Sequence, residues 1–257
     1  MNSVLRFFAL ATVGVLVLPT LILGYIGLNA SQFADWEFAG LTSDSFLGAI
    51  RSPQFVPALL SSLSRGVIVC VMSLAIGLVF TVAYLWGAKW TRRMIGGALV
   101  ILFACPPTSY CLHLLYIARA CGLGGGSLLV ILGQLQYAVP LSTILLVAGL
   151  GRGASSEYEA ALVLGAPWPI AFFRFLVLKR LVFVMAAAST ALYLSVDDLT
   201  SCVYLRGANG AIALTEYIWR QMQTDVTPVI AWESIGLTLV CLVLFVPVMR
   251  LVRKENA

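Results

Sequence analysis

Long runs of apolar residues, separated by short polar stretches, make up most of the chain. A helix needs about 20 apolar residues to cross the hydrocarbon core of a bilayer. Six runs reach that length, so the pattern predicts an all-α integral membrane fold with six transmembrane helices. Their expected ranges are Phe7–Leu28, Gly66–Trp86, Met94–Ile117, Leu128–Leu150, Leu181–Tyr204 and Val229–Val252.

The composition agrees with this pattern. Hydrophobic residues make up 61% of the 257 residues and charged residues 11%, less than half of the roughly 25% typical of soluble domains. The mean hydropathy is +0.98. A water-soluble fold could not bury this much apolar surface, so we expect the surrounding solvent to be lipid. The net charge of +5 is then explained by basic cytoplasmic loops, and binding of nucleic acid is not expected.

The positions of lysine and arginine predict the orientation. With the N-terminus inside, the cytoplasmic stretches hold more basic residues than the external ones, so the positive-inside rule places both termini in the cytoplasm. The cytoplasmic set is Arg6, Lys89, Arg92, Arg93, Arg152, Arg174, Lys179, Arg180, Arg250, Arg253 and Lys254. The external set is Arg51, Arg65, Arg119, Arg206 and Arg220.

The stretches between the runs predict one transmembrane domain covering residues 1–257. The first run is too long for the apolar core of a signal peptide and lacks a nearby small-residue cleavage site, so we expect it to be retained. The external loop Asn29–Arg65 is expected to hold a short interfacial helix near Ser43–Ile50. The longest cytoplasmic connection is Gly151–Arg180.

That cytoplasmic connection reads as two helices joined by a turn. Ser156 and Glu159 have the spacing of a capping box, which satisfies free backbone donors at a helix start. Gly165 stands where a helix end favours a left-handed residue. Pro167 suits the first turn of a second helix, expected at Trp168–Leu178. The sequence therefore predicts an apolar helical hairpin on the cytoplasmic side.

The residues Glu159-Ala160-Ala161, followed by Gly165, resemble the EAA loop of ABC importer permeases. In that family the loop forms a coupling helix that docks in a groove of the ATPase subunit. The family motif continues after the glycine with a pattern like I-x-L-P. The corresponding positions here are Phe175, Val177 and Leu178, so the apolar character is kept but the proline is missing. The alternative is that Glu159 only caps its own helix. The resemblance predicts a coupling loop over about 151–180, with docking residues Glu159, Ala160, Ala161, Gly165 and Pro167.

The resemblance extends along most of the chain. The six-helix layout, Pro106-Pro107, Ser195–Asp198 and Thr224–Pro228 together look like the second permease subunit of spermidine/putrescine-type importers. This resemblance implies a type I ABC importer permease fold and transport of polyamines into the cytoplasm by alternating access. Phosphonate, iron, sulfate and thiamine are the alternative cargoes within the same class of importer.

The resemblance also implies the partners. They are an ABC ATPase dimer, a second permease subunit that is a different chain, and a periplasmic or extracellular substrate-binding protein, all at a bacterial inner (plasma) membrane. The glycine-rich run Gly122–Gly126 is not followed by Gly-Lys-Ser/Thr, so it is not a P-loop. We therefore expect no cofactor and no catalytic residue on this chain, with ATP and Mg held by the partner ATPase.

Two adjacent acids, Asp197 and Asp198, fall in the outer half of the predicted fifth helix. A carboxylate at membrane depth costs about 2.5–3.5 kcal/mol on insertion scales, so such groups usually face a bundle interior or a watery cavity. They would attract a cationic substrate. The alternative is that one of them pairs with Arg65, with Arg206 or with a neighbouring subunit.

Other polar residues are weaker candidates for the substrate pathway. Pro106-Pro107 should kink or break the third helix, which would let Tyr110 and His113 line a cavity. Glu233 is expected in the first turn of the sixth helix, where an acid also interacts favourably with the helix dipole. Four residues of the fifth connection, between the fifth and sixth helices, have helical spacing: Glu216, Tyr217, Trp219 and Arg220. Their aromatic side chains are expected to mark an interfacial belt, and the alternative is that the aromatics and the acid bind an amine through cation–π contacts.

The remaining chemistry argues against other classes of protein. The six cysteines lie mostly in apolar runs without a C-x-x-C pair, so we expect neither a metal site nor disulfides. A secondary transporter would carry its own ion-coupling site and often an inverted repeat. A membrane enzyme would need several catalytic polar groups, and the chain has a single histidine.

Overall fold

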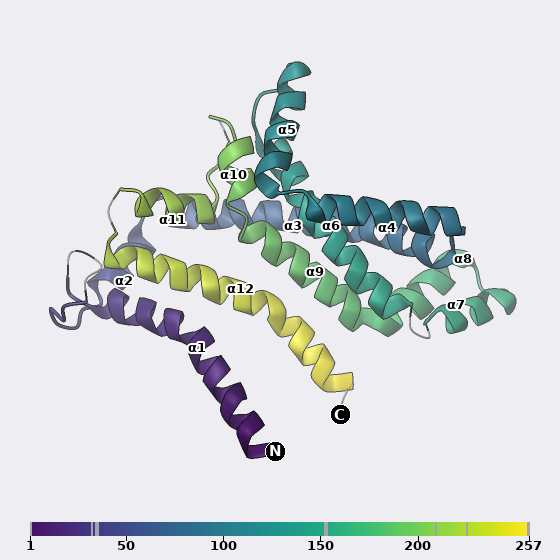
Figure 1. Cartoon of the computed structure of the whole chain (residues 1–257), viewed down its shortest axis with the longest axis horizontal. Coiled ribbons are helices and arrows are strands. Elements are labelled where there is room, and N and C mark those ends of the chain that lie inside the picture. The colour runs from purple at the N-terminus through teal and green to yellow at the C-terminus, as the bar shows by residue number, and fades with distance from the viewer. Residues whose placement is uncertain are drawn as a thin grey trace. The chain divides into compact units, whose positions relative to one another are not determined.

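The structure is a computed structural model that describes residues 2–31, 33, 36–151, 154–208, 210–224 and 226–255. Arg152 and Asp225, which enter the predictions above, lie outside these residues. A π-helical segment (Phe172–Val177) and a 3-10 turn (Leu178–Arg180) connect α8 to α9. The α-helices, drawn in Figure 1, are α1 (Asn2–Leu28), α2 (Asp44–Arg51), α3 (Phe55–Trp86), α4 (Lys89–Ala104), α5 (Pro107–Ala120), α6 (Ser127–Leu150), α7 (Ala154–Val163), α8 (Trp168–Ala171), α9 (Leu181–Val196), α10 (Thr200–Leu205), α11 (Leu214–Met222) and α12 (Pro228–Glu255).

The chain divides into two compact units, and each is described by itself. The first unit combines Met1–Leu59 with Leu214–Val240. The second unit combines Leu60–Ala213 with Cys241–Ala257. Helices α3 and α12 contribute residues to both units.

Four of the described helices are long and apolar enough to cross a membrane. Helices α4 and α5 pass the same test together, but they are bent by 101° at the break between them, which allows up to five spans. Helix α9 has only 16 residues, too few to span about 30 Å of hydrocarbon alone. The four single spans are Arg6–Leu28, Phe55–Trp86, Ser127–Leu150 and Pro228–Val252.

The predicted third span is interrupted at its two prolines. Helix α4 ends at Ala104 and α5 begins at Pro107. Pro106 has an extended ψ of 136°, and a proline cannot donate the hydrogen bond that would continue a helix. The expectation that Pro106 and Pro107 kink or break this segment is confirmed.

The predicted fifth span is also broken, whereas its apolar pattern predicts one continuous helix. Helix α9 ends at Val196 and α10 begins at Thr200, so Asp197 and Asp198 lie in the break instead of on a continuous helix. The cause is local competition for backbone hydrogen bonds, at which aspartate is effective. The backbone N–H of Ser201 donates to Asp198 Oδ1 at 3.2 Å.

The first connecting segment is shorter than predicted. Helix α3 begins at Phe55, so the last 11 residues of the expected loop Asn29–Arg65 belong to α3. Helix α2, Asp44–Arg51, confirms the short helix expected near Ser43–Ile50. The helical spacing recognised around Glu216 is likewise confirmed by α11.

Helices α6 and α9 pack along each other and form the core of the second unit (Figure 1). Two glycines of α6 allow neighbouring helices to approach closely. A Cβ atom on Gly149 would lie 2.1 Å from Phe183 Cγ of α9, and one on Gly133 would lie 2.7 Å from Ser201 Oγ of α10, so the second glycine allows the close approach of α10. Two thirds of the apolar window of α6 is buried inside the chain, so α6 is the central helix of this unit.

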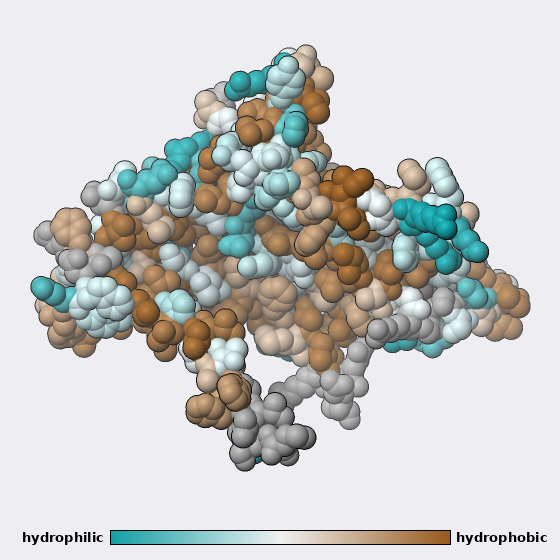
Figure 2. All heavy atoms as spheres, in the orientation of Figure 1, coloured by the Kyte–Doolittle hydropathy of each residue, from teal (hydrophilic) through white to brown (hydrophobic). Residues whose placement is uncertain are grey.

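The long helices also present apolar side chains at the surface, as Figure 2 shows in brown. Soluble proteins rarely expose large contiguous apolar patches, so this surface fits contact with lipid or with other membrane helices. Side chains more than 60% exposed include Leu10, Leu16, Val71, Val79, Val100 and Ile101.

Candidate functional site

A polar cavity of about 170 Å³ lies beside α6 in the second unit. Its walls come from α6, from the start of α5 and from the break between α9 and α10. Non-helical backbone at membrane depth is tolerated where it is shielded by protein or lines a cavity. The polar residues of the wall are Gln134, Gln136, Tyr137, Asp197, Asp198 and Ser201.

Side chains of α6 satisfy the backbone of the first break. Because Pro106 ends α4, the carbonyl groups just before it lose their helical donors. Gln136 Nε2 donates to the carbonyl oxygens of Cys105 and Leu102, at 2.6 and 3.2 Å. The Tyr137 hydroxyl donates to the same Cys105 oxygen at 3.2 Å. The broken end of α4 is therefore fixed to α6.

The second break is held by the same helix. Gln134 Nε2 donates to the carbonyl oxygen of Ser195 at 3.1 Å. The Ser195 hydroxyl donates in return to Gln134 Oε1 at 2.6 Å. Both residues are buried. This reciprocal pair fixes the end of α9 beside α6 and leaves Asp197 and Asp198 at the cavity wall.

Two carboxyl groups at the cavity wall, those of Asp197 and Asp198, are the groups that favour a cation. The helix dipoles are balanced, because each break joins the negative end of one helix, α4 or α9, to the positive end of the next, α5 or α10. The Tyr193 hydroxyl donates to Asp197 Oδ2 at 3.2 Å. Among the described contacts Asp197 thus has Tyr193 as its side-chain partner, instead of the Arg65 or Arg206 considered from the sequence.

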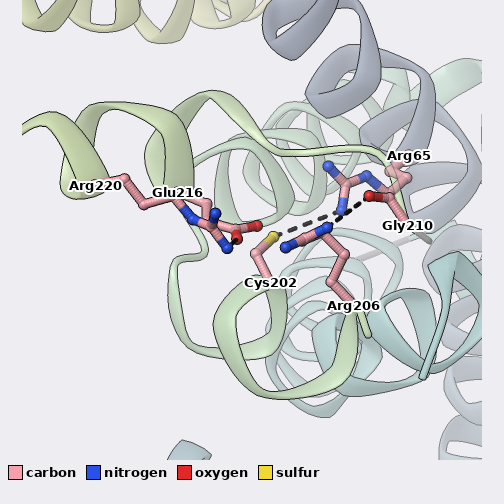
Figure 3. A network of polar contacts seen from close by, with 6 residues as sticks. All are labelled: Arg65, Cys202, Arg206, Gly210, Glu216 and Arg220. Atoms are coloured by element: carbon pink, nitrogen blue, oxygen red, sulfur yellow. Dashed lines mark hydrogen bonds and ion pairs between the residues drawn. The ribbon is translucent and has the colours of Figure 1, made fainter. Parts of the chain in front are cut away.

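Both of those arginines make contacts of their own (Figure 3). Arg65 of α3 is only 5% exposed. It donates to the carbonyl oxygen and the hydroxyl of Ser61, at 3.1 and 2.9 Å, and its Nη1 lies 3.7 Å from Cys202 Sγ. Arg206 donates to the Gly210 carbonyl oxygen at 2.7 Å. Arg65 thus connects α3 to Cys202 of α10, and Arg206 holds the segment that follows α10.

The other predicted pathway residues lie elsewhere. Tyr110 is half-buried and His113 is exposed on α5, and neither lines the cavity. Glu233 belongs to the first unit. Of the five predicted pathway residues, the cavity therefore brings together Asp197 and Asp198.

Glu233 is the centre of a buried polar network in the first unit. It is the sixth residue of α12, which starts at Pro228, so the expected position in the first turn is wrong. Its carboxylate accepts hydrogen bonds from the Tyr217 hydroxyl at 3.2 Å and from Gln221 Nε2 at 2.7 Å. Ser52 Oγ lies 2.7 Å from the Tyr217 hydroxyl. Burial raises the pKa of the Tyr217 phenol above its usual value, which keeps its proton available for Glu233.

Helix α11 carries the remaining predicted residues. Glu216 is 1% exposed and pairs with Arg220, one turn away, at 2.8 Å (Figure 3). Tyr217 is buried, so it does not belong to an interfacial belt, whereas Trp219 is exposed. The interfacial role stays a prediction for Trp219.

The hairpin predicted over about 151–180 begins with a helix whose end is well defined. Gly165 has a φ of +86°, the left-handed conformation expected at this position. Its N–H donates to the Leu162 carbonyl at 3.0 Å, and the Ala166 N–H donates to the Ala161 carbonyl at 2.9 Å. These two bonds form a Schellman motif. Ala160 of this helix is exposed and Ala161 is buried.

The start of the hairpin differs from the prediction. Helix α7 begins at Ala154, so Ser156 lies inside its first turn and the expected capping box with Glu159 is wrong. Glu159 Oε1 instead accepts a hydrogen bond from Trp86 Nε1 at 3.0 Å. Pro167 is the residue before α8, not part of its first turn.

The tip of the hairpin is apolar and exposed. Val163 and Leu164 are each 87% exposed, and Trp168 is 58% exposed. An ion pair between Lys179 and Glu157 joins the two arms behind this tip. Apolar side chains at this exposure are costly in water, so the tip is suited to bury itself in a partner.

The sequence pattern alone does not single out the side chains that organise the cavity and the hairpin. Gln134, Gln136 and Tyr137 interrupt an apolar run, which is the signal that marks functional or shielded positions within a membrane helix. Ser201 and Trp86 gave no comparable signal. Each becomes significant only through a contact with a residue distant in sequence.

Comparisons with solved structures identify the fold. The chain is similar to a chain of a bacterial alginate ABC transporter solved in complex with an alginate pentasaccharide-bound periplasmic protein. The TM-score is 0.67, with 15% identity, over 99% of this chain and 96% of that chain. It is also similar to a chain of an amino acid ABC transporter solved with histidines, with a TM-score of 0.62 and 13% identity over 83% of this chain and 100% of that one. No family model and no curated protein matches the sequence. The fold is therefore the helical fold found in chains of ABC transporters.

Proposed function

We propose that this chain is the transmembrane permease subunit of an ATP-driven ABC importer. The observation that carries the proposal is the fold, which matches chains of two ABC transporters over nearly their whole length. An importer subunit without a P-loop needs a partner that hydrolyses ATP. The exposed apolar tip of the hairpin supports the proposal because it offers a surface on which such a partner can dock. The hairpin would dock on that ATPase and transmit its closure to the membrane helices.

In this proposal the chain crosses a bacterial inner membrane six times, with both termini in the cytoplasm. The third and fifth crossings are then broken helices, formed by α4 with α5 and by α9 with α10. Transporters commonly place their substrate site at such discontinuous helices. The excess of lysine and arginine on one side supports this orientation.

The docking role can be tested at Leu164. We expect Leu164→Ser to reduce co-purification with the cognate ATPase at least about tenfold, because an apolar side chain buried at an interface contributes about 1.5–3 kcal/mol. The measurement is capture of a tagged importer ATPase from the same organism, co-expressed with the chain. Leu123→Ser, which alters an exposed leucine outside the hairpin, is the control and should retain the ATPase. Full retention by the Leu164 variant would contradict docking through this tip.

We further propose that the importer has a second, different permease chain and an external substrate-binding protein. Support for the binding protein comes from the similar alginate transporter, which was solved with its periplasmic protein. ATP-driven closure of the ATPase pair would switch the pathway between outward and inward openings. Such a switch requires that the ligands bind the two states with different affinities.

The proposed cargo is a polyamine such as spermidine or putrescine. Its support is the cavity chemistry: two carboxyl groups lie at its wall, near the carbonyl ends of α4 and α9. Half-helix C-terminal ends and unwound carbonyls are groups that bind cations in transporters. The similar structures come from alginate and amino acid transporters, so the cargo is proposed from this chain's own residues.

A substitution of Asp197 tests whether the cargo is a polyamine. We expect Asp197→Asn to lower uptake of radiolabelled putrescine about tenfold, because loss of one charge pair with a cationic cargo costs about 1.4 kcal/mol. Co-purification with the ATPase should not change. Asp44→Asn, on the exposed first turn of α2, is the matched control. Unchanged uptake in the Asp197 variant would contradict a direct role, and absence of putrescine uptake by the unaltered protein would contradict the cargo.

A further inference from the structure

One polar contact between the hairpin and α3 is not indicated by the sequence. Trp86 is the last residue of α3, and its indole N–H donates to Glu159 Oε1 of α7 at 3.0 Å. The Trp86 ring also packs on Tyr158, with ring centroids 5.1 Å apart. A polar contact and an aromatic contact thus connect the end of α3 to two adjacent residues of α7.

The α7 side of this junction is anchored in the core. Tyr158 is 7% exposed and belongs to a buried cluster with Leu146 and Leu150 of α6 and with Phe172 of the second arm. Glu159 lies beside Tyr158 but at the surface. A displacement of α7 must therefore move the carboxylate of Glu159 together with the packed face of the same helix.

The α3 side is equally constrained. The Arg92 guanidinium donates to the Leu85 carbonyl oxygen at 2.6 Å, which ties the last turn of α3 to the first turn of α4. The Gly87 N–H donates to the Ala83 carbonyl at 3.0 Å. A Cβ on Gly87 would lie 2.1 Å from the same Ala83 oxygen. The chain therefore turns tightly after Trp86. Because Arg92 ties the last turn of α3 to α4, a shift of the Trp86 ring is passed to both helices.

These contacts separate two roles within the hairpin. The exposed apolar residues, Val163 and Leu164, lie at the tip and are free to enter a partner. Glu159, about one turn earlier, directs a carboxylate oxygen to Trp86 within its own chain. Its position is that of a residue holding the hairpin to α3.

We propose that the Glu159–Trp86 hydrogen bond is a polar link through which movement of α7 reaches the end of α3, beside the apolar packing of α3 on the buried cluster that contains Tyr158. This inference rests on the proposed importer function, in which the ATPase moves α7. Glu159 is then a positioning residue that acts through Trp86 and does not itself hold the ATPase. Loss of this hydrogen bond would leave docking of the ATPase intact but reduce the response of α3 to ATP.

Hydrogen–deuterium exchange on the complex with its ATPase in nanodiscs tests this link, since exchange reports local opening of each helix separately. In the unaltered complex, ATP with vanadate should change exchange in α7 and in the last two turns of α3. Trp86→Phe and Glu159→Ala should keep the change in α7 and weaken the change in the last two turns of α3. Glu159→Gln retains an acceptor oxygen and should restore the α3 response. Trp90→Phe, which alters an exposed tryptophan on α4, should behave as the unaltered protein.

The outcomes separate this inference from the proposed function. Loss of ATPase co-purification in Glu159→Ala, with retention in Trp86→Phe, would overturn the link and assign Glu159 to the ATPase interface. A normal α3 response in both variants would also overturn it. If the unaltered chain does not retain an importer ATPase at all, the proposed function fails, and the inference that rests on it fails for that separate reason.

Discussion

Gly149→Ala is expected to lower the free energy of unfolding by about 3 kcal/mol, near the upper end of the usual cost of overpacking a core. The added Cβ would lie 2.1 Å from Cγ and 2.4 Å from Cβ of Phe183 on α9. The second of these atoms is attached directly to the backbone, so rotation of the ring cannot relieve the clash. Helices α6 and α9 would have to separate. Thermal unfolding of the purified chain in detergent measures the effect.

Gly96→Ala provides the matched control. Gly96 lies inside α4, and a Cβ there would meet nothing within 4 Å. Alanine is a better helix former than glycine by about 0.5–1 kcal/mol, so this variant should be as stable as the unaltered protein or slightly more stable. Equal stability of the Gly96 and Gly149 variants would show that α6 and α9 do not pack as closely as described.

Gln136→Leu is expected to cost about 3 kcal/mol, because two carbonyl groups would lose their donor. Gln136 is 2% exposed and donates to Leu102 and Cys105 at the end of α4. Each buried polar group left without a partner costs about 1–3 kcal/mol, offset in part by the better burial of leucine. The Tyr137 hydroxyl still reaches the Cys105 oxygen, which limits the loss. Unfolding in detergent is again the measurement.

Gln223→Leu is the control for this substitution, because Gln223 is exposed after α11. Its effect should stay within about 0.5 kcal/mol, as for most surface substitutions. A Gln136 variant as stable as this control would mean that the broken end of α4 obtains its donors elsewhere. The structure would then be wrong about which helix supports the cavity.

The sequence predicted most elements of the fold because long apolar runs and strong helix breakers are local signals. The break at Pro106 follows from the missing N–H of proline, and the left-handed Gly165 follows from a glycine placed after good helix formers. The break at Asp197 was not predicted. It depends on a backbone hydrogen bond that Asp198 accepts from Ser201. An acid in an apolar run does not tell whether it lies on a continuous helix or in a break.

The candidate site was only partly predictable for a related reason. Asp197 and Asp198 were identified because charge within an apolar segment is expensive wherever it occurs. The break at Pro106-Pro107 predicts that Tyr110 and His113 line a cavity, but the direction of α5 after the 101° bend between α4 and α5 cannot be inferred from composition. The contact of Glu159 with Trp86 joins residues 73 positions apart, and local patterns contain no information on such pairs.

The support of both broken helices by α6 has a mechanical consequence. Gln134 holds the end of α9, and Gln136 holds the end of α4. These glutamines are two residues apart on one helix, so they point in directions that differ by about 200°. A rotation of α6 about its axis would pull both glutamines away from their carbonyl groups at once. Movements that preserve both hydrogen bonds must therefore carry α4, α6 and α9 together as one rigid body and cannot turn α6 between its neighbours.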